Sequence, residues 1–392
     1  MTETTDTQTI DPQRQEKARE YARIRRRLML LDLLLGAVLL ILWLVTGWSA
    51  DLRDWIYSWT QNVWVAVPAF AGIFGGIFYL IDLPLSYYSG FVLPHRFDQS
   101  NQDLSGWITD QVKSLALGAV LGGILIEIIY YVLRAAPDTW WLWAGGILLL
   151  FNVILANLAP VLIFPIFFDF SPLGEEYRDL KERLIELAEE AGTQVKGVFK
   201  FDMSRRTKDA NAALTGLGST RRIILGDTLL DEFQEEEIET VLAHELGHHV
   251  HHDIPLGIAI QSALTLGGLY LASLLLEWGA SVFQFQSLSD IAAFPLFGLA
   301  MGLYGLITMP LGNAYSRWRE RLADRYALET TRKGEAYASA LVRLANQNLA
   351  EADPEPWVEF LLYSHPALQK RIDMARAYAA TSATEKERIP PH

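Results

Sequence analysis

The chain has 392 residues, of which 51% are hydrophobic, and it carries a formal net charge of −13. This composition is too apolar for an ordinary soluble enzyme. The negative charge argues against nucleic acid as a partner, because a nucleic-acid-binding surface needs an excess of Lys and Arg. The absence of Cys excludes disulfide bonds and thiolate metal sites.

Apolar stretches account for this composition, and each is long enough to cross about 30 Å of hydrocarbon. They are Leu28–Trp48, Val63–Leu93, Leu115–Leu133, Trp140–Phe168, Ile254–Trp278 and Ala292–Leu311. No small-residue cleavage site follows the first stretch, so we expect a membrane span there and not a removable signal peptide. The sequence therefore predicts a multi-pass integral membrane protein with six spans, whose surroundings are a lipid bilayer.

Basic residues predict the orientation of these spans. Seven Lys and Arg residues lie between Arg14 and Arg27, directly before the first span. Because basic segments stay on the cytoplasmic side, the N-terminus is expected there. Six crossings then bring the basic segments Lys181–Arg222 and Arg317–Arg343 to the same side. We expect the globular part of the chain to face the cytoplasm.

The expected segments follow from these spans. They are a basic N-terminal segment (1–27), a membrane domain of four spans (28–168), a first cytoplasmic part (169–253), spans five and six (254–314), a second cytoplasmic part (315–380) and a tail (381–392). Residues 1–12 and the chain after about Thr381 are polar, and we expect them to be disordered.

The first cytoplasmic part predicts a small α+β domain. Glu175–Ala191 has helical periodicity. The β-like runs Gly197–Asp202, Ala210–Thr215 and Arg222–Leu225 follow. Glu235–Asp253 predicts a helix that begins with acidic residues, as the helix dipole prefers. The expected fold class is mainly α: a helical membrane bundle with a small cytoplasmic α+β domain, which the last two spans split.

A histidine-rich motif lies on the last of these helices. His244 and His248 are four residues apart, so both imidazoles project from one helix face and can bind the same metal ion. Glu245, between them, can hold a water molecule and take its proton. This HExxH arrangement is the one that zinc peptidases use. The pattern fixes only three positions, so it is not specific by itself.

A catalytic zinc ion needs a third protein ligand and an open position for water. Glu320 and Asp324 are also four residues apart, on a predicted helix that continues from the sixth span. One carboxylate can bind the metal while the other orients a ligating histidine through its second ring nitrogen. The two cytoplasmic parts of the chain are therefore expected to share one metal site.

These motifs belong to longer stretches that resemble the Ste24-type integral-membrane metallopeptidases (CAAX prenyl protease 1, peptidase family M48). The stretches follow the order of that family over residues 63–376. They are Phe91–Lys113, Pro165–Leu173, Ser204–Leu230, the HELGH of 244–248, the SRxxExxAD of 316–324, and Ser364-His365-Pro366 with Arg371. Two features depart from the family. Six spans are predicted where the family has seven, and Ala210-Asn211-Ala212-Ala213 stands where S-N-A-Y is usual.

The resemblance implies a zincin fold of the gluzincin type with one Zn²⁺ per chain. His244, His248 and Glu320 would bind the zinc ion, and Glu245 would act as general base. The resemblance implies no role for the other histidines of the cluster, which we expect to be solvated or interfacial: His249, His251 and His252.

The resemblance also implies residues around the metal. Asp324 would hold a metal ligand from behind, and His365 would stabilise the oxyanion. Arg371 would support the site or the substrate chain. Asn211 and the strand around it would pair with an extended substrate as an added edge strand.

The expected function is zinc-dependent endopeptidase activity on membrane-associated or C-terminal CAAX-type proteins, with or without a prenyl group. The family includes enzymes that remove the last three residues of such tails and members that clear damaged membrane proteins. We expect a monomer in a prokaryotic cytoplasmic membrane. The alternatives are a metal transporter and a proteolytically inactive metal-binding membrane protein. The charged flanks of His244 and the intact Glu245 favour the enzyme.

Overall fold

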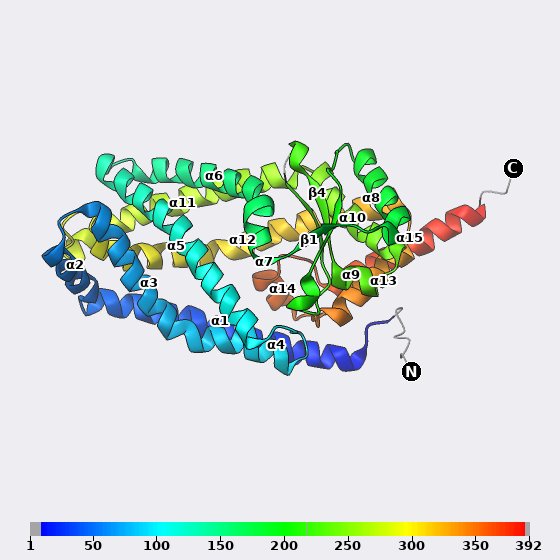
Figure 1. Cartoon of the computed structure of the whole chain (residues 1–392), viewed down its shortest axis with the longest axis horizontal. Helices are drawn as coiled ribbons and strands as arrows, with labels where there is room; N and C mark the ends of the chain where they lie inside the picture. The colour runs from blue at the N-terminus through cyan, green and yellow to red at the C-terminus, as the bar shows by residue number, and fades with distance from the viewer. Residues whose placement is uncertain (1–8, 217, 389–392) are drawn as a thin grey trace.

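The computed structural model describes residues 9–216 and 218–388. Long helices form one end of the molecule, and a small sheet with shorter helices forms the other (Figure 1). We call the second part the globular end. Among the described residues, six helical stretches are long and apolar enough to cross a membrane: Pro12–Val45, Val63–Arg96, Leu104–Ala135, Trp140–Phe167, Asp253–Val282 and Ile291–Thr331. Each of the six predicted spans lies within one of them, apart from a few end residues.

These stretches comprise most of the labelled helices. They are α1 (Pro12–Val45), α3 (Val63–Tyr87), α4 (Leu93–Arg96), α5 (Leu104–Ala135), α6 (Trp140–Leu158), α7 (Phe164–Phe167), α11 (Asp253–Val282) and α12 (Phe294–Thr331). π-Helical turns join α3 to α4 and α6 to α7, at Tyr88–Val92 and Ala159–Ile163. A short helix, α2 (Trp48–Trp59), connects the first two long stretches.

Helix α1 begins well before the first predicted span. The Asp11 carboxylate caps its N-terminus by accepting hydrogen bonds from the backbone N–H groups of Gln13 and Arg14. Gln15 and Ala18 are buried on one face of this first part. Charged residues on the other face keep the mean hydropathy low, so hydropathy alone did not reveal the helix. The expected disorder of residues 1–12 concerns mostly residues 1–8, which lie outside the described residues.

The sheet has four short strands in the order β1-β2-β4-β3. They are β1 (Phe170–Pro172), β2 (Val198–Phe201), β3 (Ala212–Thr215) and β4 (Arg222–Gly226). β2 and β4 are parallel, and the two outer strands are antiparallel to their neighbours. β2, β3 and β4 correspond to the three predicted strands, whereas β1 was not predicted. β3 lies at an edge of the sheet, where a further strand can pair.

Shorter helices complete the globular end. They are α8 (Arg178–Glu190), α9 (Asp227–Glu232), α10 (Glu235–Val250), α13 (Gly334–Gln347), α14 (Pro356–Leu362) and α15 (Leu368–Arg388). Leu180, Leu184 and Leu187 of α8 are buried on one face because they are spaced three and four residues apart. The expected disordered tail after Thr381 was wrong over the described residues, since α15 continues to Arg388.

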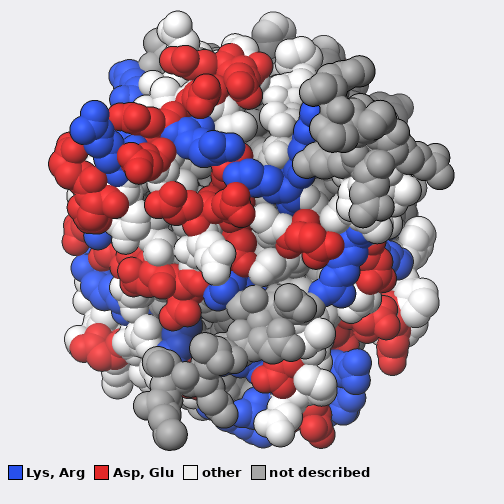
Figure 2. Space-filling view, turned by 90° about the vertical axis from the view of Figure 1, so that its right-hand side faces the viewer, with Lys and Arg blue, Asp and Glu red and all other residues white. Residues whose placement is uncertain are grey.

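Close contact between α10 and α12 joins the two separated parts of the globular end. Gly247 makes this contact possible: a Cβ atom placed there would lie 2.8 Å from the Cα atom of Ala323. Side chains of both charge signs cover the surface of this end (Figure 2), which indicates that it faces water. The HELGH motif of α10 and the Glu320–Asp324 segment of α12 therefore face each other in a solvated part of the molecule.

Candidate metal centre

Three side chains that could hold a metal ion converge between α10 and α12. Ligand atoms of His244, His248 and Glu320 all lie within 4.8 Å of one another. The two histidine Nε2 atoms are 3.3 Å apart. Glu320 Oε1 lies 3.4 Å from His248 Nε2, and Glu320 Oε2 lies 3.3 Å from His244 Nε2. The structure thus brings together the three residues that the spacing and the resemblance selected.

A carboxylate fixes the orientation of each imidazole. The Nδ1 atom of His244 lies 2.9 Å from Asp324 Oδ1, and that of His248 lies 2.7 Å from Asp253 Oδ2. In this arrangement Nδ1 carries the proton that is donated to the carboxylate. Each Nε2 atom then presents a lone pair to the space that both rings share with Glu320.

This arrangement fits a bound cation. Among the described residues, the buried Oε2 atom of Glu320 has no hydrogen-bond partner, although the ring of His244 is close. Burial lowers the pKa of His244, but the neighbouring carboxylates of Asp324 and Glu320 raise that pKa to about 9. The same excess of negative charge that attracts a proton would hold a divalent metal ion. Two imidazoles and one carboxylate are a ligand set that zinc accepts.

Glu245 lies one position along α10 from His244, and its side chain is half-buried. Burial raises the pKa of its carboxyl, and the nearby histidines lower it. A carboxylate with a raised pKa binds a proton more readily than one in water. The arrangement therefore combines a metal-binding pocket with a neighbouring group that can take up and release a proton.

A buried network fixes Asp324 behind His244. Arg371 donates from Nη2 to Asp324 Oδ1 at 2.6 Å and from Nε to Oδ2 at 3.0 Å. Tyr337 also donates its hydroxyl proton to Asp324 Oδ1, at 2.5 Å, and its oxygen lies 3.2 Å from the Nδ1 atom of His244. Tyr337 was not predicted, because no sequence motif connects it with the candidate metal ligands.

Asp253 and Arg319 were also missed. Arg319 donates from Nε to Asp253 Oδ1 at 2.5 Å, and from Nη2 to the backbone oxygen of His251. These contacts hold the chain where α10 ends and α11 begins. The only sequence signal for Asp253 is an acidic residue just after the histidine cluster.

His365 approaches the centre from the segment between α14 and α15. Its Nε2 atom lies 3.2 Å from Glu320 Oε1, yet 59% of its side chain is exposed, so it can contact a substrate as well as the site. Arg317 donates to the backbone oxygens of Glu359 and Tyr363, which holds this segment against α12.

A cleft of about 800 Å³ opens beside the centre, and His365, Arg371 and Asn211 are among the residues that line it. Asn211 is exposed and lies just before β3, and its backbone oxygen accepts a hydrogen bond from the N–H of Gly226 at 2.9 Å. The structure thus brings the predicted substrate-binding residue to the edge strand and into the same cleft as His365.

The remaining histidines of the cluster lie around the end of α10. His249 is half-buried, and its Nε2 atom lies 3.3 Å from Arg221. The ring of His251 packs edge-on against that of Tyr326. His252 is exposed and has a positive φ of 57°, which separates α10 from α11. None of the three belongs to the group of converging metal-ligand atoms found among the described residues.

A bundle of span-length helices and a centre of this composition define the class: the protein is an integral-membrane metallopeptidase. A model described as the CAAX prenyl protease N-terminal region, with five membrane helices, matches residues 4–169, and the model of peptidase family M48 matches residues 175–379. The chain belongs to peptidase family M48.

Relatives of the chain are similar over most of its length. The metalloprotease YhfN of Bacillus subtilis is 29% identical, and the match covers 96% of this chain and 86% of that protein. The CAAX prenyl protease 1 of Saccharomyces cerevisiae is 32% identical, with 77% of this chain and 70% of that protein covered. The crystal structure of S. mikatae Ste24p superimposes with a TM-score of 0.84 at 26% identity, covering 95% of this chain and 90% of that one.

Proposed function

We propose that the protein is a zinc-dependent endopeptidase with one Zn²⁺ per chain, bound by His244, His248 and Glu320. The observation that carries this proposal is the convergence of two imidazole lone pairs and a carboxylate next to Glu245. When bound, zinc supplies Lewis acidity, which polarises a peptide carbonyl and makes water more acidic.

The side chains of the protein transfer the proton, stabilise the oxyanion and bind the substrate. Glu245 takes the proton of the attacking water on its carboxylate and passes it to the leaving amine. His365 donates a hydrogen bond from its ring to the oxygen that becomes negative. Asp324 holds His244 in its orientation, and Arg371 keeps Asp324 ionised and in place. Asn211 and the free edge of β3 bind the substrate backbone in an extended conformation.

We further propose that the substrates are membrane-associated proteins or proteins with C-terminal CAAX-type tails. Relatives named CAAX prenyl protease 1 support the second class. The B. subtilis relative matches nearly the whole chain, which supports a prokaryotic cytoplasmic membrane. We propose a broader role in membrane-protein quality control beside the processing of C-terminal tails. The basic residues before the first span support an N-terminus and an active site that face the cytoplasm. All proposed site residues come from one chain, which supports a functional monomer.

The substitution Glu245→Gln tests the mechanism. It removes the proton acceptor but keeps the size of the side chain, so we expect peptide cleavage to fall at least about 100-fold while one zinc ion per chain is retained. Glu235→Gln, an exposed change on the same helix, is the matched control and should cut at the wild-type rate. A zinc-loaded Glu245→Gln variant that cuts as fast as the wild type would refute the proposal.

Mass-spectrometric mapping of cleavage sites tests the substrate class. A farnesylated CAAX peptide and the same peptide without the farnesyl group are compared side by side. Cleavage of both peptides supports the broad role, whereas cleavage of the farnesylated peptide alone contradicts it.

A further inference from the structure

The N-terminal part of α1 forms a wall of the active-site cleft. Its residues that line this cleft lie on one face of the helix, spaced three and four positions apart: Tyr21, Ala22, Arg25, Arg26 and Met29. His365, Arg371 and Asn211 line the same cleft. The segment that fixes the expected topology therefore also faces the space where a substrate would bind.

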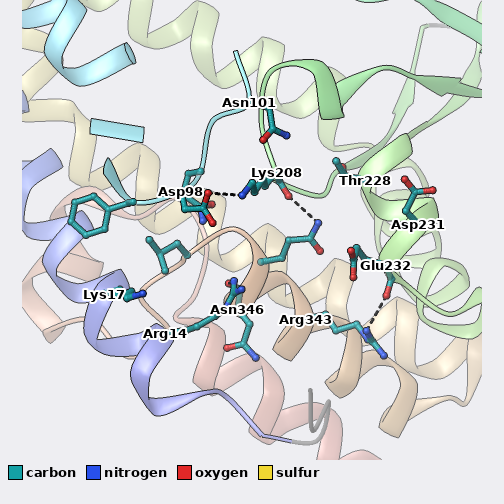
Figure 3. Close-up of a pocket in the computed structure, with 14 residues that line it drawn as sticks. Arg14, Lys17, Asp98, Asn101, Lys208, Thr228, Asp231, Glu232, Arg343 and Asn346 are labelled. Carbon is teal, nitrogen blue, oxygen red and sulfur yellow. Dashed lines mark hydrogen bonds and ion pairs between the residues drawn. The ribbon is translucent and has the colours of Figure 1, made fainter. Parts of the chain in front are cut away.

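Hydrogen bonds near its N-terminus attach this helix to the globular end. The Gln15 amide donates to the backbone oxygen of Ala350 and accepts from the N–H of Ala352, both at 3.0 Å. Arg14 donates to the backbone oxygen of Asn346 at 2.8 Å. Figure 3 shows Arg14 and Asn346 side by side at a second cavity, of about 380 Å³, between α1 and the globular end. These hydrogen bonds attach the start of the cleft wall to the globular end.

The arginines that line the cleft differ in whether a carboxylate neutralises them. Arg26 forms an ion pair with Glu351 at 2.6 Å, and Arg371 forms one with Asp324 at 2.6 Å. Arg25 forms no ion pair with any carboxylate of the described residues, and its guanidinium lies over the ring of Tyr21, 5.5 Å from the centroid. Asp209, which also lines the cleft, interacts with Arg25 through longer-range electrostatic attraction and not through an ion pair. A guanidinium without a carboxylate partner is suited to bind an incoming anion.

We propose that Arg25 binds the C-terminal carboxylate of the substrate, an inference that rests on the proposed activity toward C-terminal tails. Cleavage three residues from the end leaves about 10 Å of extended chain between the reacting bond and the carboxylate. A cleft of about 800 Å³ that both Arg25 and His365 line has room for a chain of this length. Met29, Leu349 and Leu362 also line the cleft and suit aliphatic residues before the carboxylate. By binding the carboxylate, Arg25 then determines how many residues from the C-terminus the substrate is cut.

The test compares two peptides that end in a CAAX sequence, one with a free carboxylate and one with a C-terminal amide. They are cleaved by the full-length zinc-loaded protein in detergent. We expect the wild type to have a KM about tenfold lower for the acid than for the amide. Arg25→Gln should remove this difference by raising the KM for the acid alone, and Arg25→Lys should keep part of it. Arg23→Gln is the matched control, because Arg23 is exposed and lies on the opposite side of α1.

Two results would overturn the inference. One is a wild type that treats acid and amide alike. The other is an Arg25→Gln variant that changes the KM of both peptides equally. This result would indicate that Arg25 has a general structural role, or that it binds a different anion, such as a lipid phosphate. If the wild type cuts neither peptide, the proposed function fails instead. In that case, binding of the acid and the amide to Glu245→Gln, compared with the double variant Glu245→Gln/Arg25→Gln, still decides whether Arg25 recognises the carboxylate.

Discussion

Each imidazole of the metal centre is held at its Nδ1 atom by a carboxylate from another part of the chain. Asp324 holds His244 inside a buried network with Arg371 and Tyr337. Asp253 holds His248 from the start of α11, and Arg319 fixes Asp253 in turn. The orientation of the two rings therefore depends on the packing of several helices, and not on α10 alone.

The role of Asp253 can be tested by the substitution Asp253→Asn. An amide holds the ring of His248 less strongly than a carboxylate and makes its Nε2 atom a weaker donor to the metal, so zinc affinity should fall about 10- to 100-fold. Competition with a chelating dye measures this affinity. Asp179→Asn, an exposed change on α8, serves as the control. Unchanged affinity in Asp253→Asn would show that His248 needs no such partner.

The sequence predicted the core of the site better than its surroundings. His244, Glu245 and His248 lie on one helix, and Glu320 and Asp324 on another, so helical spacing alone brings each set to one face. Tyr337, Asp253 and Arg319 reach the site only through tertiary contacts, which have no fixed spacing along the chain. Spacing could therefore not reveal them.

At the scale of the elements, the contact between α10 and α12 determines whether the site exists. Gly247 lies between His244 and His248 and packs against Ala323, which lies between Glu320 and Asp324. Each helix therefore carries its smallest side chains at the point where its ligands must come closest to those of the other helix.

The substitution Gly247→Ala tests this contact. A Cβ atom 2.8 Å from the backbone of Ala323 must push the two helices apart, which moves Glu320 away from the histidines. We expect a lower midpoint of thermal unfolding and weaker zinc binding, by calorimetry and zinc titration. Gly118→Ala in α5 is the control, because a Cβ atom there meets nothing within 4 Å. Equal zinc affinity in both variants would mean that the contact tolerates the extra methyl group.

Two elements show where local sequence signals end. β1 has only three residues, one of them Pro172, so it offers no alternation to detect and exists because it pairs with β2. The first part of α1 is helical because its buried face packs on the globular end, and its many charges hide this from a hydropathy profile. Both elements are determined by their neighbours.

On the scale of the whole molecule, the apolar stretches predict the long helices well, because a span must be apolar over a length that few other segments reach. The family model of the N-terminal region is described with five membrane helices, whereas residues 12–167 contain four stretches of spanning length and the short helix α2. Trp48, Trp55 and Trp59 of α2 are each at least half exposed. Tryptophan concentrates at the surface of a bilayer, so α2 suits a position along the membrane surface and not across it.

Helix α1 has 34 residues in one uninterrupted rod, about 51 Å long at 1.5 Å per residue. Only about 30 Å of such a rod fits in hydrocarbon, and the rest is the cleft wall that carries Arg25.

In vesicles of phosphatidylcholine with acyl chains from 14 to 22 carbons, we expect the KM for a peptide acid to pass through a minimum at one bilayer thickness. A variant with glycine at both Arg27 and Leu28, which weakens the helix between the two parts, should lose most of this dependence. A KM that is the same in all vesicles would contradict the expectation.

Because α1 is continuous, it can transmit a movement from the membrane to the cleft. A mismatch between the apolar length of this helix and the local bilayer changes its tilt, and a rigid rod transmits a tilt along its whole length. The lipid surroundings would thus adjust the width of the active site without any contact between a lipid and the metal centre. The thickness of the membrane would then be one of the variables that determine which substrates this peptidase accepts.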